Sequence, residues 1–108
     1  MNNIYYDTEK CGLNQIGLLD EADLSYEFNT LLVVEVIQSK KLYWATSSGC
    51  SCPVPFEEWS YVSDEDNNLN VLNKETLESF IRGVSNFPAT LDERQSLISN
   101  VKERLNKQ

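Results

Sequence analysis

The fold of this chain is decided by the stretch YEFNTLLVVEVIQSKKLYWAT, which spans residues 26–46. Its first half, from Tyr26 to Ile37, is rich in β-branched residues, and its centre is apolar on both faces, as expected of a central strand. The polar residues 38–41 favour a turn, and residues 41–46 return as a second strand. The stretch therefore predicts an antiparallel hairpin at the middle of a sheet.

Two more strands are expected beside this hairpin. Residues 13–19 alternate loosely between apolar and polar types, and a polar turn at 20–23 joins them to the hairpin. These three strands form an antiparallel meander. Residues 58–62 favour a short fourth strand, and residues 64–68 form a polar, acidic loop.

The hydrophobic period then changes to that of helices. Asn73 is suited to cap a helix at 74–86, and Thr90 with Glu93 forms a capping box that opens a second helix at 91–106. The apolar positions of these helices are Leu77, Phe80, Ile81 and Val84 in the first, and Leu91, Leu97, Ile98, Val101 and Leu105 in the second. Strands followed by helices predict an α+β fold, in which a small antiparallel meander of three to four strands precedes two helices packed on one face.

The chain has the length of a single domain, at 108 residues. We expect one domain over residues 1–108, with a β-rich part at 1–63, an acidic loop at 64–73 and a two-helix part at 74–108. No apolar run approaches the roughly 20 residues that span a bilayer, and the first residues lack the regions of a signal peptide. An odd number of cysteines without an export signal favours reduced thiols and a cytoplasmic location.

The net charge of −8 is concentrated in the middle of the chain. Between Cys11 and Asn73 there are ten acidic residues and two lysines, whereas the two flanks balance. A field of this sign repels phosphate backbones, so it argues against direct nucleic-acid binding and favours a protein partner with a basic surface. A role in solubility alone is the alternative.

The segment GCSCPVPFEEW, residues 49–59, is the most unusual in the chain. One interpretation is a small zinc site in which Cys11, Cys50 and Cys52 act with a carboxylate such as Glu57, although local zinc-binding pairs usually lie two to four residues apart. A second is a reactive thiol. The chain contains no histidine, which excludes Cys-His and Ser-His-Asp catalysis, and acidic surroundings disfavour a thiolate.

The third interpretation is structural, and it is the one we favour. Gly49 permits a positive φ, Pro53 and Pro55 restrict the backbone, and either proline is a candidate for a cis bond. The segment would then form a rigid corner that seats Phe56 and Trp59 against the sheet. We therefore expect no catalytic residue, no cofactor and a protein that is not an enzyme.

A protein-binding role requires exposed side chains that a partner recognises. The acidic loop and the corner supply the candidates, because they combine carboxylates with an aromatic ring and small thiols. The candidate interaction residues are Asp64, Glu65, Asp66, Glu57, Glu58, Trp59, Cys50 and Cys52.

Two motifs resemble a family of small uncharacterised proteins encoded by tailed bacteriophages of Gram-positive hosts. One is the Tyr-Tyr-Asp-x-Glu-Lys start in YYDTEKCGL at 5–13, and the other is the Ser-Gly-Cys-Ser-Cys-Pro run at 48–53. The resemblance covers about the first 60 residues. That family has Pro where this chain has Thr8 and Phe where it has Cys11, and a replaceable Cys11 weakens the three-thiolate site.

The resemblance implies a phage accessory gene expressed inside a bacterium, and it brings no activity with it. We expect a non-enzymatic protein in the host cytoplasm that binds a host protein with a basic surface, as an inhibitor of a defence or nucleic-acid-binding enzyme in the manner of an anti-CRISPR protein. Direct binding to nucleic acid or membrane is not expected. The alternatives are a structural, assembly or regulatory protein of the virion, and a small zinc-binding protein.

Overall fold

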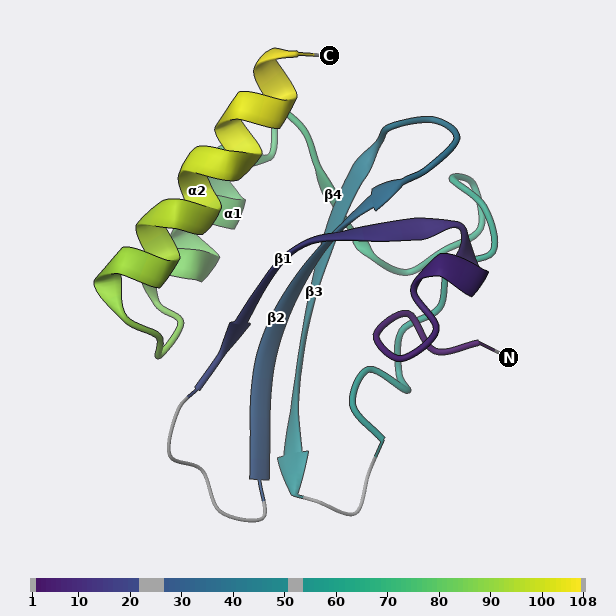
Figure 1. Ribbon diagram of the computed structural model, residues 1–108, viewed down its shortest axis with the longest axis horizontal. Coiled ribbons are helices and arrows are strands. Elements are labelled where there is room, and N and C mark those ends of the chain that lie inside the picture. Colours follow the sequence, from purple (N-terminus) through teal and green to yellow (C-terminus); the bar gives the residue numbers. More distant parts are fainter. Residues whose placement is uncertain (1, 22–26, 51–53, 108) are drawn as a thin grey trace.

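The computed structural model of the protein describes residues 2–21, 27–50 and 54–107. Its elements confirm the predicted α+β fold, because an antiparallel meander is followed by two helices (Figure 1). In chain order they are the 3-10 helix η1 (Glu9–Cys11), the strands β1 (Leu13–Asp20), β2 (Glu27–Val36), β3 (Leu42–Cys50) and β4 (Asn70–Leu72), and the helices α1 (Leu77–Ser85) and α2 (Leu91–Asn106).

The four strands lie in the order β1-β2-β3-β4, and every neighbouring pair is antiparallel. The predicted central strand is confirmed, because β2 pairs with β1 on one side and with β3 on the other. Leu32 marks this register, since it lies opposite Leu18 of β1 and Ala45 of β3. β1 and β4 are consequently the two edges of the sheet.

β3 is longer than the sequence predicted. It was expected to end at Thr46, but it continues to Cys50, which lies opposite Glu27 at the start of β2. Gly49 lies inside the strand, opposite Phe28, so the corner begins later than predicted. The long partner strand explains the difference, because it offers backbone groups that residues 47–50 satisfy by pairing.

The fourth strand lies elsewhere than predicted. Among the described residues, the segment 58–62 makes only an isolated bridge between Tyr61 and Asn67. The strand that completes the sheet is β4, inside the stretch 64–73 that was predicted to be loop. Its three residues pair with β3, where Leu72 lies opposite Leu42 and is buried. A strand this short has no measurable alternation of its own.

The helix boundaries follow from the capping residues. The Asn73 side chain accepts hydrogen bonds from the backbone N–H groups of Glu75 (2.9 Å) and Thr76 (3.0 Å). It therefore caps a turn, and α1 begins at Leu77 rather than at the predicted residue 74. The predicted capping box of α2 is present in part: the Glu93 N–H donates to Thr90 Oγ1 at 3.2 Å.

The two faces of the sheet are covered by different kinds of structure (Figure 1). Both helices pack on one face, as predicted, around Leu31, Val33, Phe80, Val84, Leu97 and Val101. Leu91 is an exception among the predicted apolar positions, because 59% of its surface is exposed. Residues 2–12 and 54–69, which we call the loop layer, cover the other face around Ile4, Leu32, Val34, Tyr43 and Phe56.

Candidate functional site

The turn at residues 54–59 is fixed to the sheet by buried contacts. Phe56 is completely buried and adopts a positive φ of 65°, a conformation that a bulky residue holds only when its surroundings impose it. Its N–H donates to Ser47 Oγ at 3.0 Å, and Trp59 Nε1 donates to the Thr46 carbonyl at 2.9 Å. This part of the corner therefore packs against β3 through the two aromatic residues that the structural interpretation named.

The structure tests the expectation of a cis peptide bond in the corner. None of the described bonds is cis, and this includes the one before Pro55. The expectations for Cys52 and for a cis bond at Pro53 lie outside the described residues.

The acidic loop is held in place by one carboxylate. Asp64 Oδ1 accepts hydrogen bonds from the hydroxyl groups of Tyr43 and Tyr61, each at 3.0 Å. Burial alone would raise the pKa of Asp64, but the hydrogen bonds from Ser39, Tyr61 and Tyr43 and the charge of Lys41 outweigh it and lower that pKa below the usual 3.8. Asp64 is thus an internal acceptor that anchors the loop to the sheet.

The rest of the acidic loop closes on itself by backbone hydrogen bonds. The N–H of Val62 donates to the Asp66 carbonyl at 3.0 Å, and the N–H of Asp66 donates to the Ser63 carbonyl at 3.1 Å. Asn68 Nδ2 donates to the Glu58 carbonyl at 2.9 Å, which links this loop to the 54–59 turn. The predicted acidic loop is consequently a folded one.

Three of the predicted interaction residues are well placed for a partner. Glu57, Glu65 and Asp66 are exposed and lie in the loop layer. Glu58 is exposed too, but its carboxylate accepts a hydrogen bond from Ser47 Oγ at 3.0 Å. Trp59 and Asp64 are partly buried and serve the packing of the layer instead.

A surface hollow of about 690 Å³ lies where the acidic loop meets the β2–β3 turn and the end of η1. Its walls include Cys11, Ile37, Ser39, Val62 and Glu65. Ile37 and Val62 expose 42% and 65% of their surfaces, so the hollow combines apolar and acidic walls. Sequence reasoning missed Ile37 and Val62, because it placed them at the ends of two predicted strands and gave no signal that these ends lie side by side.

The zinc site that was considered requires Cys11 and Cys50 to lie close together, and the structure separates their backbones; Cys52 lies outside the described residues. Cys11 adjoins Gly12, whose carbonyl accepts from the Ile37 N–H just beyond one end of β2, whereas Cys50 lies opposite Glu27 at the other end. Nine residues of strand separate these ends by roughly 30 Å, and zinc–sulfur bonds are about 2.3 Å long. Cys11 and Cys50 therefore cannot share an ion.

Cys11 is also poorly suited to act as a nucleophile. Burial raises the pKa of its thiol, and the Asp7 carboxylate raises it further. A thiol with a raised pKa stays protonated at neutral pH and is unreactive. In the described ranges, no three Cys, Asp or Glu side chains come together as metal ligands would.

The charge separates by layer once the chain is folded. The loop layer carries seven acids and one lysine, whereas residues 73–107 carry five acids and six basic residues. Five of the ten acids between Cys11 and Asn73 lie in the loop layer, where Asp7 and Glu9 join them. Asp20, Glu27 and Glu35 lie on the strands instead.

The loop layer also exposes apolar surface. Tyr6, Val54 and Val62 are among the most exposed large apolar side chains of the described chain. Aromatic and apolar side chains framed by charged ones are typical of protein-binding surfaces.

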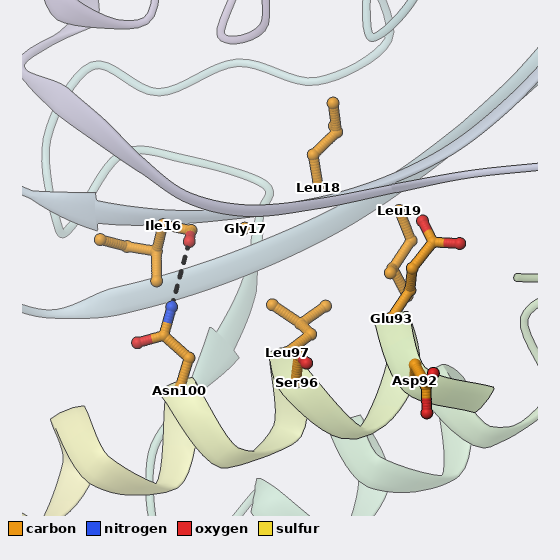
Figure 2. Close-up of a pocket in the computed structure, with 9 residues that line it drawn as sticks. All are labelled: Ile16, Gly17, Leu18, Leu19, Asp92, Glu93, Ser96, Leu97 and Asn100. Carbon is orange, nitrogen blue, oxygen red and sulfur yellow. Dashed lines mark hydrogen bonds between the residues drawn. The ribbon is translucent and has the colours of Figure 1, made fainter. Parts of the chain in front are cut away.

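A second hollow, of about 390 Å³, lies between β1 and α2 (Figure 2). Ile16, Leu18 and Leu19 line it from the strand, and Asp92, Glu93 and Ser96 line it from the helix. No part of the sequence analysis pointed to it, because it depends on how α2 is positioned along the edge of the sheet.

Comparison with known proteins identifies a family and no activity. The family model described as a domain of unknown function, DUF7574, matches residues 2–108. The chain belongs to the DUF7574 family. No curated protein and no solved structure matches the chain. Neither helix in the described part of this DUF7574 domain is long and apolar enough to cross a membrane.

Proposed function

We propose that this protein is a non-enzymatic phage accessory protein that binds a basic surface of a host protein through its loop layer. The observation that carries the proposal is the charge of that layer, with seven acids against one lysine. Such a face attracts basic surfaces over distances of about 8 Å at physiological salt and repels nucleic acid.

The rigidity of the loop layer supports a role in binding. Asp64 and Phe56 anchor its two loops to the sheet through hydrogen bonds to Tyr43 and Ser47 of β3. Glu65 and Asp66 are thereby presented on a framework that is ordered before the partner arrives. A preorganised surface loses less conformational entropy on binding and so binds more tightly.

A host enzyme that binds nucleic acid is the partner that this surface suits best. Its basic groove is built for phosphates, and carboxylates at similar spacing occupy the same lysine and arginine side chains. The protein would then act as an inhibitor by competing with the nucleic acid. The chemistry of the chain agrees with a non-enzymatic role, because it has no histidine and the pKa of the Cys11 thiol is raised.

The proposal is tested by capturing partners from host cells with matched charge variants. One variant combines Glu57→Gln, Glu65→Gln and Asp66→Asn, which removes three exposed charges from the loop layer. The control combines Glu75→Gln, Glu78→Gln and Glu103→Gln, which removes three exposed charges from the helical side. Captured proteins are identified by mass spectrometry and quantified against the wild-type protein.

We expect a basic host protein to be captured by the wild type and by the control, and to be lost with the loop-layer variant. Adding the corresponding nucleic acid should release it. Equal capture by both charge variants would contradict the proposal, and recovery of the protein within purified virions would favour a structural role instead.

A further inference from the structure

Among the described residues, the outer edge of β1 has backbone groups without hydrogen-bond partners. Residues of β2 point their backbone groups alternately to β1 and β3, and Val36 points to β3, because its N–H donates to the Lys41 carbonyl. The backbone N–H and C=O groups of Leu32 and Thr30 point to β3, like those of Val36. Their partners on β1 are Leu18 and Asp20, whose own N–H and C=O groups therefore point away from the sheet. No backbone group among the described residues bonds to them.

A bulge interrupts this outer edge. The register of β1 shifts between Gln15 and Gly17, which leaves Ile16 unpaired with β2. Asn100 of α2 donates to the Ile16 carbonyl at 3.3 Å and so occupies it (Figure 2). Beyond the bulge, the outward-facing backbone groups are those of Leu18 and Asp20.

The hollow between β1 and α2 lies beside these outward-facing groups. Figure 2 shows Leu97 directed toward the strand and Leu18 directed away from the helix. Leu97 packs against Gly17, where a Cβ atom would overlap its side chain. An added strand would thus lie along β1, with one set of its alternating side chains above the helix and the other set beside Leu18.

The charge around the hollow indicates which kind of segment can bind along β1. Asp92 and Glu93 line the hollow and are exposed, and no basic residue is among the described residues that line it. Asp20 adds a carboxylate at the open end of the edge. A second copy of the chain paired through β1 would bring these acids close to their counterparts, which is unfavourable. A basic segment meets them with opposite charge.

We propose that the free edge of β1 accepts an extended, basic peptide segment of a partner protein, which pairs with Leu18 and Asp20 and extends the sheet. This site is separate from the loop layer. Each of the two surfaces is tested by its own variants, so that one proposal can fail without the other.

The probe is a fluorescent hexapeptide of alternating lysine and valine, titrated into the full chain at low salt. The control is the same peptide with every backbone amide methylated, which keeps its charge but removes the donors that an added strand needs. We expect saturable binding of the first peptide and at least about tenfold weaker binding of the second, because several ladder hydrogen bonds are lost. Hydrogen exchange measured by NMR should slow at the Leu18 and Asp20 amides.

Two variants locate the site. Leu18→Pro removes an N–H that does not pair with β2, and we expect it to weaken binding at least about fivefold. Asp92→Asn combined with Glu93→Gln removes the charge beside the hollow and should weaken binding about threefold to tenfold. Glu65→Gln with Asp66→Asn removes equal charge from the loop layer and should leave binding within about twofold.

Several results would overturn the proposal. These are the absence of saturable binding, equal binding of the methylated peptide, or unchanged exchange at Leu18 and Asp20 in the bound state. Protection of these amides in the protein alone, together with a dimer in sedimentation, would assign the edge to a second copy. If Leu18→Pro does not fold, the charge variant and the methylated peptide decide the question.

Discussion

At the scale of single residues, Asp64 is the side chain whose role the structure changes most. It was a candidate for contact with a partner, but it accepts hydrogen bonds from Tyr43 and Tyr61 at 3.0 Å. The sequence shows Asp64 only as one of three neighbouring acids. Tyr43 lies 21 residues away, and only the pairing of the strands brings it to the loop.

Asp64→Asn should lower the stability of the fold more at neutral pH than in acid. Because the pKa of Asp64 is lowered in the folded protein, its carboxylate stabilises the fold above the unfolded value near 3.8, and this contribution is lost as the pH falls through the folded pKa. We expect a loss of about 1 kcal/mol at pH 7, since Asp64 is partly exposed. Urea denaturation at pH 7 and pH 3 measures the difference.

The comparison depends on a matched control. Asp66→Asn, at the exposed tip of the same loop, should change stability by less than about 0.5 kcal/mol at both values of pH. An Asp64→Asn variant with the same loss at pH 3 as at pH 7 would contradict the role given to the carboxylate.

Tyr61→Phe should make the fold less sensitive to alkaline pH. Burial raises the pKa of Tyr61 above its usual value of 10, and the Asp64 carboxylate raises it further. The unfolded chain therefore ionises first, so the stability contributed by Tyr61 is complete below pH 10 and is lost as the pH rises above it. Thermal unfolding between pH 9 and pH 11 should show a shallower decline for Tyr61→Phe than for the wild type; identical declines would refute this.

At the scale of elements, the strongly patterned ones were predictable. The apolar centre of β2 and the capping residue Thr90 of α2 are clear signals. Both elements lie within a residue of their predicted bounds where the structure describes them. β4 was missed because three residues are too few to display a period. The site was harder to predict than the fold, since the hollow beside β1 depends on the bulge at Ile16 and on Leu97 of a distant helix.

The packing of α2 on β1 depends on the missing side chain of Gly17. A Cβ at this position would overlap Leu97 Cδ1, so Gly17→Ala should destabilise the fold by about 1–3 kcal/mol. In a Leu97→Ala background the overlap is gone, and the same substitution should be neutral or stabilise by up to about 1 kcal/mol, because alanine restricts the unfolded chain. A double-mutant cycle in urea measures the coupling, and equal effects in both backgrounds would disprove the contact.

At the scale of the whole molecule, the sheet separates two layers of different charge. The helices with their balanced charge cover one face, and the loop layer with its seven acids and one lysine covers the other (Figure 1). The sequence placed ten acids in the middle of the chain, and the fold brings five of them together with Asp7 and Glu9 on one side of the sheet. A partner that approaches through electrostatic attraction therefore meets the loop layer first.

The most direct test of this account is the rate at which the protein associates with the captured host partner, measured at increasing salt. We expect the association rate of the wild type to fall at least about tenfold between 50 mM and 500 mM salt. The variant with Glu57→Gln, Glu65→Gln and Asp66→Asn should associate more slowly and respond less to salt, whereas the helical-side control should follow the wild type. An association rate that does not depend on salt, or equal rates for the two variants, would contradict the acidic loop layer as the binding surface.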